Sequence, residues 1–332
     1  MTVSLDIANG SAALADAIKP LLERVVAADG IVPLSEQARI ELTRNIPTIT
    51  HVTVSEDASV VGYAQINRAG GRPAAELFVD PSVRRQGIGR ILLRTALRDA
   101  TLPSHSGEPG ANAPLRVWAH GNLPGARQLA EGEDMHVVRE LDLMERPLGS
   151  EEDPSATVEL PWIPSVATTL ATFGPNCLVQ NFVAERDERA WLDLNARAFN
   201  DHPEQGQWTL ADLRARMAES WFDANGFFVV RGRNDADGTD IDEVGPLLAS
   251  VWTKVEPDAL ATGEIYVLAV DPSAQRRGWG KRLTMLALAS LRDRAITTAT
   301  LWTDANNTPA VTTYQRAGFA VTRTDVQYAR PK

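Results

Sequence analysis

The sequence predicts an α/β protein built from two copies of one domain. The pattern D-P-S-x-x-R-x-G-x-G occurs over residues 80–89 and again over residues 271–280, with matching positions 191 residues apart. An interval of that length far exceeds a solenoid repeat and indicates a duplicated domain. Strand-like and helix-like segments alternate in both halves. The length of 332 residues also suits two domains.

The first half opens with helices. Apolar residues recur at helical spacing over Ser11–Ala28, and a second helix is expected near Gln37–Arg44. No clear strand precedes them, so this half is expected to lack or blur its first strand. The strands that follow are predicted over His51–Ser55, Val60–Asn67, Ala75–Val79, Leu115–His120 and Val137–Met144, with helices over Ile88–Ala100 and Pro124–Glu131.

Residues 148–177 are predicted to be a linker between a first domain over 1–147 and a second over 178–332. Gly149–Pro164 is acidic and contains prolines, a composition typical of linkers. Val166–Phe173 is expected to be extended chain packed on one of the two domains.

The second half repeats the order with a clear first strand. Thr209 with Asp212 resembles a capping box that opens a helix. Strands are predicted over Leu178–Ala184, Gly226–Arg231, Leu247–Val255, Glu264–Val270, Thr298–Thr303 and Phe319–Tyr328, and helices over Arg186–Phe199, Leu210–Ser220, Lys281–Arg294 and Pro309–Ala317.

Composition narrows the functional classes. The formal net charge of −10 argues against non-specific nucleic-acid binding. No apolar run approaches a membrane span, and residues 1–10 lack the pattern of a signal peptide. Cys177 is the only cysteine, so no intrachain disulfide can form, which fits a cytoplasmic protein. No histidine motif surrounds Cys177, so we do not expect it to be a nucleophile. No metal site is predicted, and a monomer is expected.

Each repeated segment predicts a phosphate site. A buried strand ends at Asp-Pro, and a glycine loop then opens a helix. The N-terminus of a helix presents free N–H groups and a positive dipole end. Glycine lets a pyrophosphate approach the backbone. Arg276, Arg277 and Lys281 add positive charge to the second copy. An ordinary strand–helix turn is the alternative reading of each copy.

Both loops resemble the [Q/R]-x-x-G-x-G/A signature of the GNAT superfamily of N-acetyltransferases. The resemblance implies two domains that each have a mixed sheet splayed in the middle, and acetyl-CoA as the co-substrate. It assigns cofactor contacts in the first half to Leu77, Phe78, Val79, Arg85, Gln86, Gly87, Ile88, Gly89 and Arg90. In the second half the contacts are Leu268, Ala269, Val270, Gln275, Arg276, Arg277, Gly278, Trp279, Gly280, Lys281, Asn307, Thr308, Pro309, Ala310, Val311 and Thr312.

Two residues of the second half are the predicted catalytic pair. The resemblance implies that Glu264, which begins the signature strand, acts as base through a water. The segment Asn307–Phe319 matches the family pattern N-x-x-A-x-x-x-Y-x-x-x-G-F. The resemblance implies that its tyrosine, Tyr314, protonates the departing thiolate. The alternatives are a solvated charge at Glu264 and a core aromatic at Tyr314. In the first half Ala130 stands in place of Tyr314, so that half is expected to be a binding or structural unit.

Five further segments resemble the mycothiol synthase family of tandem acetyltransferases. They lie around Asp29–Gln37, His202–Thr209, Trp221–Asp223, Trp252–Val255 and Glu264–Leu268. This resemblance implies that the acceptor is the cysteinyl amine of desacetylmycothiol, contacted by Glu36, Glu204, Lys254, Glu264 and Trp302. The family usually has tyrosine at the position of Trp302.

Alternatives stay open at this point. Glu36, Glu204 and Lys254 taken singly read as surface charge. Another small-amine or protein N-acetyltransferase and a non-catalytic acyl-CoA sensor are the competing functions. If Glu36 and the second-half residues touch one substrate, the site is expected in a cleft between the domains.

Overall fold

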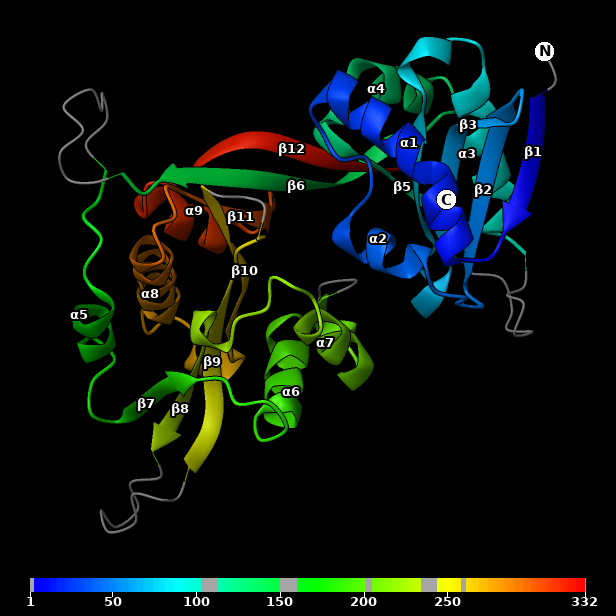
Figure 1. Ribbon diagram of the computed structural model, residues 1–332. Helices are drawn as coiled ribbons and strands as arrows, with labels where there is room; N and C mark the ends of the chain where they lie inside the picture. The colour runs from blue at the N-terminus through cyan, green and yellow to red at the C-terminus, as the bar shows by residue number, and fades with distance from the viewer. Residues whose placement is uncertain are drawn as a thin grey trace. The chain divides into compact units, whose positions relative to one another are not determined.

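The computed structural model describes residues 3–102, 113–149, 160–200, 205–233, 244–257 and 261–331. The chain divides into two compact units. Unit 1 comprises Met1–Leu141 and Arg323–Lys332, and unit 2 comprises Asp142–Thr322. Figure 1 shows the elements of both units coloured along the chain.

Unit 1 is organised around a mixed sheet in which β4 and β5 form a parallel pair. The strand order is β1-β2-β3-β4-β5-β12. Neighbours are antiparallel from β1 to β4 and from β5 to β12, and β4 pairs with β5 in parallel. The strands are β1 (Val3–Ala8), β2 (Ile49–Glu56), β3 (Ser59–Asn67), β4 (Ala74–Val79), β5 (Arg116–Ala119) and β12 (Ala320–Ala329).

Helices cover both faces of the unit 1 sheet. On one face, α1 (Ala12–Asp29) and α2 (Glu36–Leu42) pack over Tyr63 and Phe78. On the other, α3 (Ile88–Asp99) packs over the aliphatic residues of β2 to β5. Helix α4 (Pro124–Glu131) contributes Ala130 to that second core. Short 3₁₀ turns are η1 (Ala69–Gly71), η2 (Pro81–Val83) and η3 (His120–Asn122).

Unit 2 has the same architecture with larger cores. Its strand order is β6-β11-β10-β9-β8-β7, and β10 and β11 are its parallel pair. The strands are β6 (His136–Pro147), β7 (Cys177–Asn181), β8 (Phe227–Arg233), β9 (Val244–Lys254), β10 (Thr262–Val270) and β11 (Thr298–Asp304). The helices are α5 (Val166–Ala171), α6 (Glu188–Ala198), α7 (Leu210–Met217), α8 (Trp279–Asp293) and α9 (Thr308–Arg316), and the 3₁₀ turns are η4 (Gln205–Gln207), η5 (Ala224–Gly226) and η6 (Pro272–Ala274).

The two faces of the unit 2 sheet differ in composition. One face packs aliphatic residues against α8, among them Val251, Ile265 and Leu301. The other packs aromatic rings against α6, with Trp191, Phe227 and Trp252 all buried. Both faces are therefore covered, which explains why β10 reads as a nearly continuous apolar run.

The first strand of unit 1 corrects one expectation. Val3–Ala8 forms β1, paired antiparallel with β2 from Val3 opposite Glu56 to Ala8 opposite His51. This strand is difficult to predict from the sequence because it lies at the edge of the sheet, where Ile7 is 61% exposed. An edge strand of this kind lacks the apolar run of a buried strand.

The segment expected to be extended also differs. Val166–Ala171 is the short helix α5, opened by Ser165, whose hydroxyl accepts from the Thr168 N–H. It packs on α8 in unit 2. Ile163 and Phe173, which flank it, lie in the same core cluster as α8. The predicted linker 148–177 therefore has, among its described residues, parts built into unit 2.

The end of the chain does not follow the predicted bounds 178–332. Residues 326–329 of β12 pair antiparallel with β5, with Val326 opposite Ala119. Val326 and Tyr328 are buried in the core of unit 1. The Arg330 guanidinium donates to the backbone oxygen and the carboxylate of Glu133. The last ten residues thus complete the first unit rather than the second.

This arrangement predicts that residues 323–332 are required for the stability of unit 1. Deleting them removes five buried side chains, those of residues 325–329, and a strand pairing. This is a loss on the order of 5 kcal/mol, comparable to the stability of a domain. Hydrogen exchange of the β2–β5 amides should become fast in the deletion protein. Deleting only Pro331 and Lys332 is the control, because Pro331 is exposed. Unchanged protection in the longer deletion would show that β12 is dispensable.

Candidate active site

The two repeated loops have the same internal support. Asp80 in unit 1 and Asp271 in unit 2 each accept a hydrogen bond from the backbone N–H two residues on, at 2.9 Å. Each aspartate also pairs with an arginine of a preceding helix: Arg24 at 2.6 Å and Arg197 at 2.7 Å. Burial alone would raise the pKa of both carboxyls, but these hydrogen bonds and ion pairs lower it.

The glycines of both loops leave open space at the start of a helix. Gly87 and Gly278 are the N-cap residues of α3 and α8 and have φ values of 91° and 77°. A Cβ at either position would meet no heavy atom of the described residues within 4 Å. The helix N–H groups that follow face this space and can bind an anion. The cradle in each unit therefore fits a pyrophosphate.

Side chains around the loop of unit 2 divide into two groups. Gln275, Arg276, Arg277 and Lys281 are exposed around Gly278. Trp279 is instead buried, with its ring 5.9 Å from the ring of Phe173. Only the backbone of Trp279 can therefore serve a ligand. Gly280 is half-buried, and a Cβ there would meet Thr313 of α9 at 3.9 Å.

The parallel strand pair separates in both units. The pairing of β4 with β5 ends at Glu76 opposite Trp118, and that of β10 with β11 ends at Ile265 opposite Leu301. Both signature strands continue for several residues beyond their last parallel partner. The predicted cofactor residues Leu77, Phe78, Val79, Leu268, Ala269 and Val270 all lie on these continuations.

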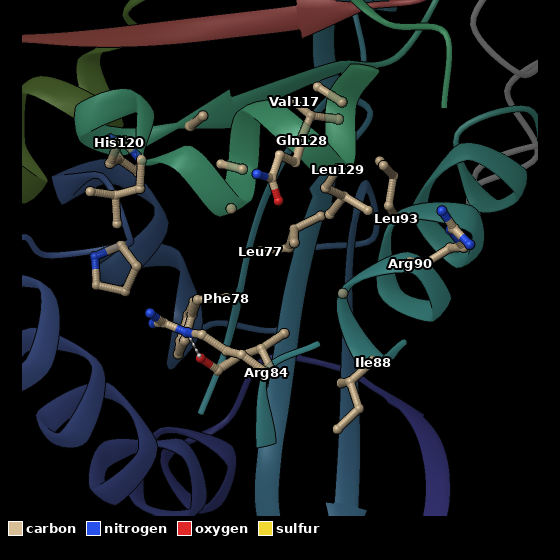
Figure 2. Close-up of a pocket in the computed structure, with 18 of the residues that line it drawn as sticks. Leu77, Phe78, Arg84, Ile88, Arg90, Leu93, Val117, His120, Gln128 and Leu129 are labelled. Atoms are coloured by element: carbon tan, nitrogen blue, oxygen red, sulfur yellow. Dashed lines mark hydrogen bonds between the residues drawn. The ribbon is translucent and has the colours of Figure 1, made fainter. Parts of the chain in front are cut away.

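Unit 1 holds a cavity of about 530 Å³ at this separation. Figure 2 shows that Leu77 and Leu129 lie between Ile88 and Arg90 at one side and His120 at the other. The lining includes eight of the nine predicted contacts, namely Leu77, Phe78, Val79, Arg85, Gly87, Ile88, Gly89 and Arg90, and the side of α4 that carries Ala126, Gln128, Leu129 and Ala130. Gln86 is exposed beside them.

The end of this cavity away from the glycine loop carries a buried charge cluster, here called the His120 cluster (Glu76, His120 and Asp325). The Nδ1 of His120 lies 2.6 Å from Oδ2 of Asp325, and its Nε2 lies 3.5 Å from Oε2 of Glu76. Burial alone would lower the pKa of His120, but the hydrogen bond to Asp325 and the neighbouring carboxylate of Glu76 raise it to about 9. The imidazole is therefore a cation at neutral pH. No local pattern could predict this cluster, because Asp325 lies 205 positions from His120 in the sequence.

In unit 2 the structure brings three of the predicted substrate residues together. Glu264 of β10 is the direct antiparallel partner of Lys254 and the parallel partner of Thr300. Trp302 lies two residues beyond Thr300 on the same face of β11, because alternate residues of a strand share a face. A carboxylate, an ammonium group and an indole thus gather at the point where β10 and β11 separate.

Aromatic residues that sequence analysis did not assign surround Lys254. Its ammonium nitrogen lies 4.8 Å from the ring centre of Trp221 and 5.5 Å from that of Tyr266, and 2.8 Å from Glu256. A register shift between Ile265 and Val267 forms a bulge at Tyr266. Tyr266 accepts a hydrogen bond from Nε of Arg216 at 2.9 Å. In the sequence, only the place of Tyr266 within the signature strand could have indicated that it contacts Lys254 and Arg216.

Tyr314 lies on α9, whose N-cap Asn307 accepts from the Ala310 N–H. Its ring packs edge-on against Phe319 at 6.0 Å, beside the α8 core. Burial raises the pKa of Tyr314 to about 12, so the phenol stays protonated at neutral pH. At the corresponding position of unit 1, Ala130 is buried in the core and offers no proton.

Glu36 is the first residue of α2 in unit 1, half-buried. Glu204 lies outside the described residues. Thr308 to Thr312 form the first turns of α9. Within the described ranges no three His, Cys, Asp or Glu side chains gather as a metal site, and no helix there is long and apolar enough to cross a membrane.

Comparison with known families matches both units. The family described as "Acetyltransferase (GNAT) family" matches residues 189–319, and "Acetyltransferase (GNAT) domain" matches residues 48–123. Among solved structures, a GCN5-related N-acetyltransferase from Sphaerobacter thermophilus is similar with a TM-score of 0.66 and 18% identity, covering 98% of this chain and 96% of that one. A tandem GNAT protein from the clavulanic acid biosynthesis pathway is similar with a TM-score of 0.65 and 16% identity, covering 98% of both chains. These likenesses show the fold.

Curated relatives are closer in sequence. A protein of Cellulomonas flavigena named mycothiol acetyltransferase is 43% identical, over 96% of this chain and 86% of that protein. Its namesake in Thermomonospora curvata is 42% identical, over 94% of this chain and 92% of that protein.

The His120 cluster predicts a loss of stability at alkaline pH. The pKa of His120 is about 9 in the folded protein against 6.5 for an unperturbed histidine. When folding raises the pKa of a histidine, its stabilisation of the fold is complete below the pKa of the unfolded state. This stabilisation is lost as the pH rises through the pKa of the folded state. The free energy of unfolding should therefore fall between about pH 6.5 and about pH 9 more steeply in the wild type than in His120→Gln. The free energy of unfolding is measured by urea titration at each pH. If it falls equally with pH in both proteins, His120 has no such stabilising role.

Proposed function

Because this chain belongs to the mycothiol acetyltransferase family and carries two GNAT domains, we propose that it transfers acetyl from acetyl-CoA to the cysteinyl amine of desacetylmycothiol, with the chemistry in unit 2. The protein is an N-acetyltransferase. The reaction would form the amide of mycothiol and release CoA, and the predicted location is the cytoplasm.

One observation carries the assignment of unit 2. Glu264 and Lys254 are direct partners at the strand separation, and the same unit supplies the protonated phenol of Tyr314. Unit 1 has the same loop and strand separation, but Ala130 replaces the phenol. The difference between the units thus lies in the proton-transfer groups and not in the phosphate cradle.

The proposed chemistry assigns each proton a group. Glu264 takes a proton from the acceptor ammonium group, directly or through a water, so that the amine can attack the thioester carbonyl. The tetrahedral intermediate collapses, the C–S bond breaks and the thiolate receives a proton from Tyr314. The nitrogen then loses its second proton to the Tyr314 phenolate, which restores the phenol, and Glu264 releases its proton to the solvent. Burial raises the pKa of Tyr314, so the phenol still holds its proton when the thiolate departs.

The acceptor is proposed to contact the family positions of this chain. Lys254, Glu264 and Trp302 stand at the strand separation in unit 2. A carboxylate suits an ammonium group, and an aromatic face suits the apolar side of a sugar. Glu36 and Glu204 are proposed as further contacts by family resemblance. Activity toward desacetylmycothiol compared with glucosamine tests the acceptor, and equal rates with both would refute the specificity.

The catalytic pair gives a kinetic prediction. Glu264→Gln and Tyr314→Phe each remove one proton-transfer group and keep the shape of the side chain. We expect kcat to fall by roughly 10²–10⁴-fold in each variant. Binding of acetyl-CoA, measured by calorimetry, should change little. A variant that keeps wild-type turnover would show that its residue has no part in the chemistry.

The two glycine loops provide a matched pair for the division of labour. Gly278→Glu should abolish turnover, because a side chain there occupies the open space before α8. Gly87→Glu introduces the same side chain at an equally strained φ in unit 1 and should leave much of the turnover. Thermal unfolding verifies that both variants are folded. Equal loss of activity would mean that unit 1 is needed for the chemistry itself.

A further inference from the structure

The loop between α1 and α2 in unit 1 lines the cavity and also leads into helix α2. It begins at Gly30, which ends α1 with a left-handed φ of 67°, and it ends at Ser35, the N-cap of α2. Ile31 and Pro33 of this loop line the unit 1 cavity. Glu36, the proposed acceptor contact, is the next residue along the chain. The loop that lines the unit 1 cavity therefore continues directly into Glu36, the proposed acceptor contact.

Three contacts hold this loop to the cavity. At its start, Asp29 forms a two-point ion pair with Arg84 of the glycine loop, at 2.7 and 2.9 Å. In its middle, Ile31 packs on Gly121, where an added Cβ would lie 2.2 Å from Cδ1 of the isoleucine. At its end, the Ser35 N–H donates to Oε2 of Glu76 at 2.7 Å.

The contact at Glu76 links the loop to the His120 cluster. The same oxygen that accepts from Ser35 lies 3.5 Å from Nε2 of His120, and Asp325 holds the other ring nitrogen at 2.6 Å. Asp325 also accepts from the Gly121 N–H at 2.7 Å, and Arg323 lies 3.2 Å from it. Glu76 is 8% exposed. Its carboxylate is thus fixed on one side by a cation that itself lines the cavity.

We propose that the unit 1 cavity, when it holds acyl-CoA, positions Glu36 for the acceptor through the loop 30–35, with Glu76 and His120 as the positioning residues. This inference rests on the proposed function, because it gives Glu36 its role from there. A ligand along β4 would contact Ile31 and Pro33 and restrict the loop. The Glu76 carboxylate would then set the first turn of α2, since Ser35 both donates to it and caps that helix through its hydroxyl.

The proposal explains why a unit without the catalytic phenol keeps an intact phosphate cradle. Ligand occupancy of unit 1 would serve acceptor binding and not turnover. Its signature is a change in the KM for the acceptor with kcat and the KM for acetyl-CoA preserved, which a general loss of structure would not produce.

The kinetic test uses the full chain and four variants. Glu76→Ala removes the acceptor for the Ser35 N–H and should raise the KM for desacetylmycothiol about tenfold, the scale of one hydrogen bond to a charged group. Glu76→Gln keeps an oxygen acceptor and should recover most of that loss. Glu23→Ala, the same change at an exposed position of α1 outside the cavity lining, is the matched control and should change little. Glu36→Ala with Glu76→Ala should be no worse than Glu36→Ala alone.

Two results would overturn the positioning role. One is a double variant whose KM for desacetylmycothiol rises by the product of the two single-variant factors. Residues that act independently contribute additively to the free energy, so such a product would mean that Glu36 and Glu76 are not coupled. The other is a Glu76→Gln variant as impaired as Glu76→Ala. Circular dichroism of each variant verifies the fold.

A ligand experiment decides the coupling without reference to the acceptor. In protein carrying Gly278→Glu, so that only unit 1 retains an open loop, saturating CoA should slow hydrogen exchange of residues 31–42. In the same protein with Glu76→Ala, the slowing at residues 35–42 should be lost. Unchanged exchange on adding CoA would refute the inference. Failure of the enzyme to acetylate desacetylmycothiol would refute the proposed function while leaving this exchange result to stand.

Discussion

The separation of one parallel strand pair governs the design of each unit. In unit 2, β10 and β11 are paired only as far as Ile265 and Leu301, and β10 then continues alone on that side to Val270. Within the described ranges, backbone groups along this continuation have no parallel partner strand, so an extended ligand can use them. The glycine loop lies at the end of the same strand. Strand edge and helix N-terminus therefore form one continuous track for an acyl carrier with a pyrophosphate.

The duplicated units share the support of this track and differ in what surrounds it. The Asp80–Arg24 and Asp271–Arg197 pairs occupy matching places, and Gly87 and Gly278 have matching backbone conformations. At the level of chemistry the units diverge. Unit 2 carries a protonated phenol and a lysine–glutamate strand pair, whereas unit 1 carries a cationic histidine between two carboxylates. Conserved scaffolding with altered titratable groups is what a division between binding and catalysis requires.

Local patterns predict the parts of the fold that depend on neighbouring residues. The glycine loops, the Thr209 capping box and the helices and strands around them depend on neighbours within a few residues, so the sequence records them directly. Strand β1 has a short alternation of apolar residues at Val3, Leu5 and Ile7, but Leu5 and Ile7 are exposed and the pairing with β2 defines the strand. Helix α5 is only six residues long, and its stability comes from packing on α8, so its sequence alone does not predict a helix.

By itself the sequence determined the duplication, the two GNAT-type loops, the loss of the tyrosine at Ala130 and the candidate pair Glu264 and Tyr314. Only the tertiary structure decided that Lys254 stands opposite Glu264, that Asp325 holds His120, and that Ser35 donates to Glu76. It also decided that the last strand completes the first unit. The reason is physical: a capping residue or a glycine turn acts within one turn of chain, whereas strand register and buried ion pairs join residues that can be 205 positions apart.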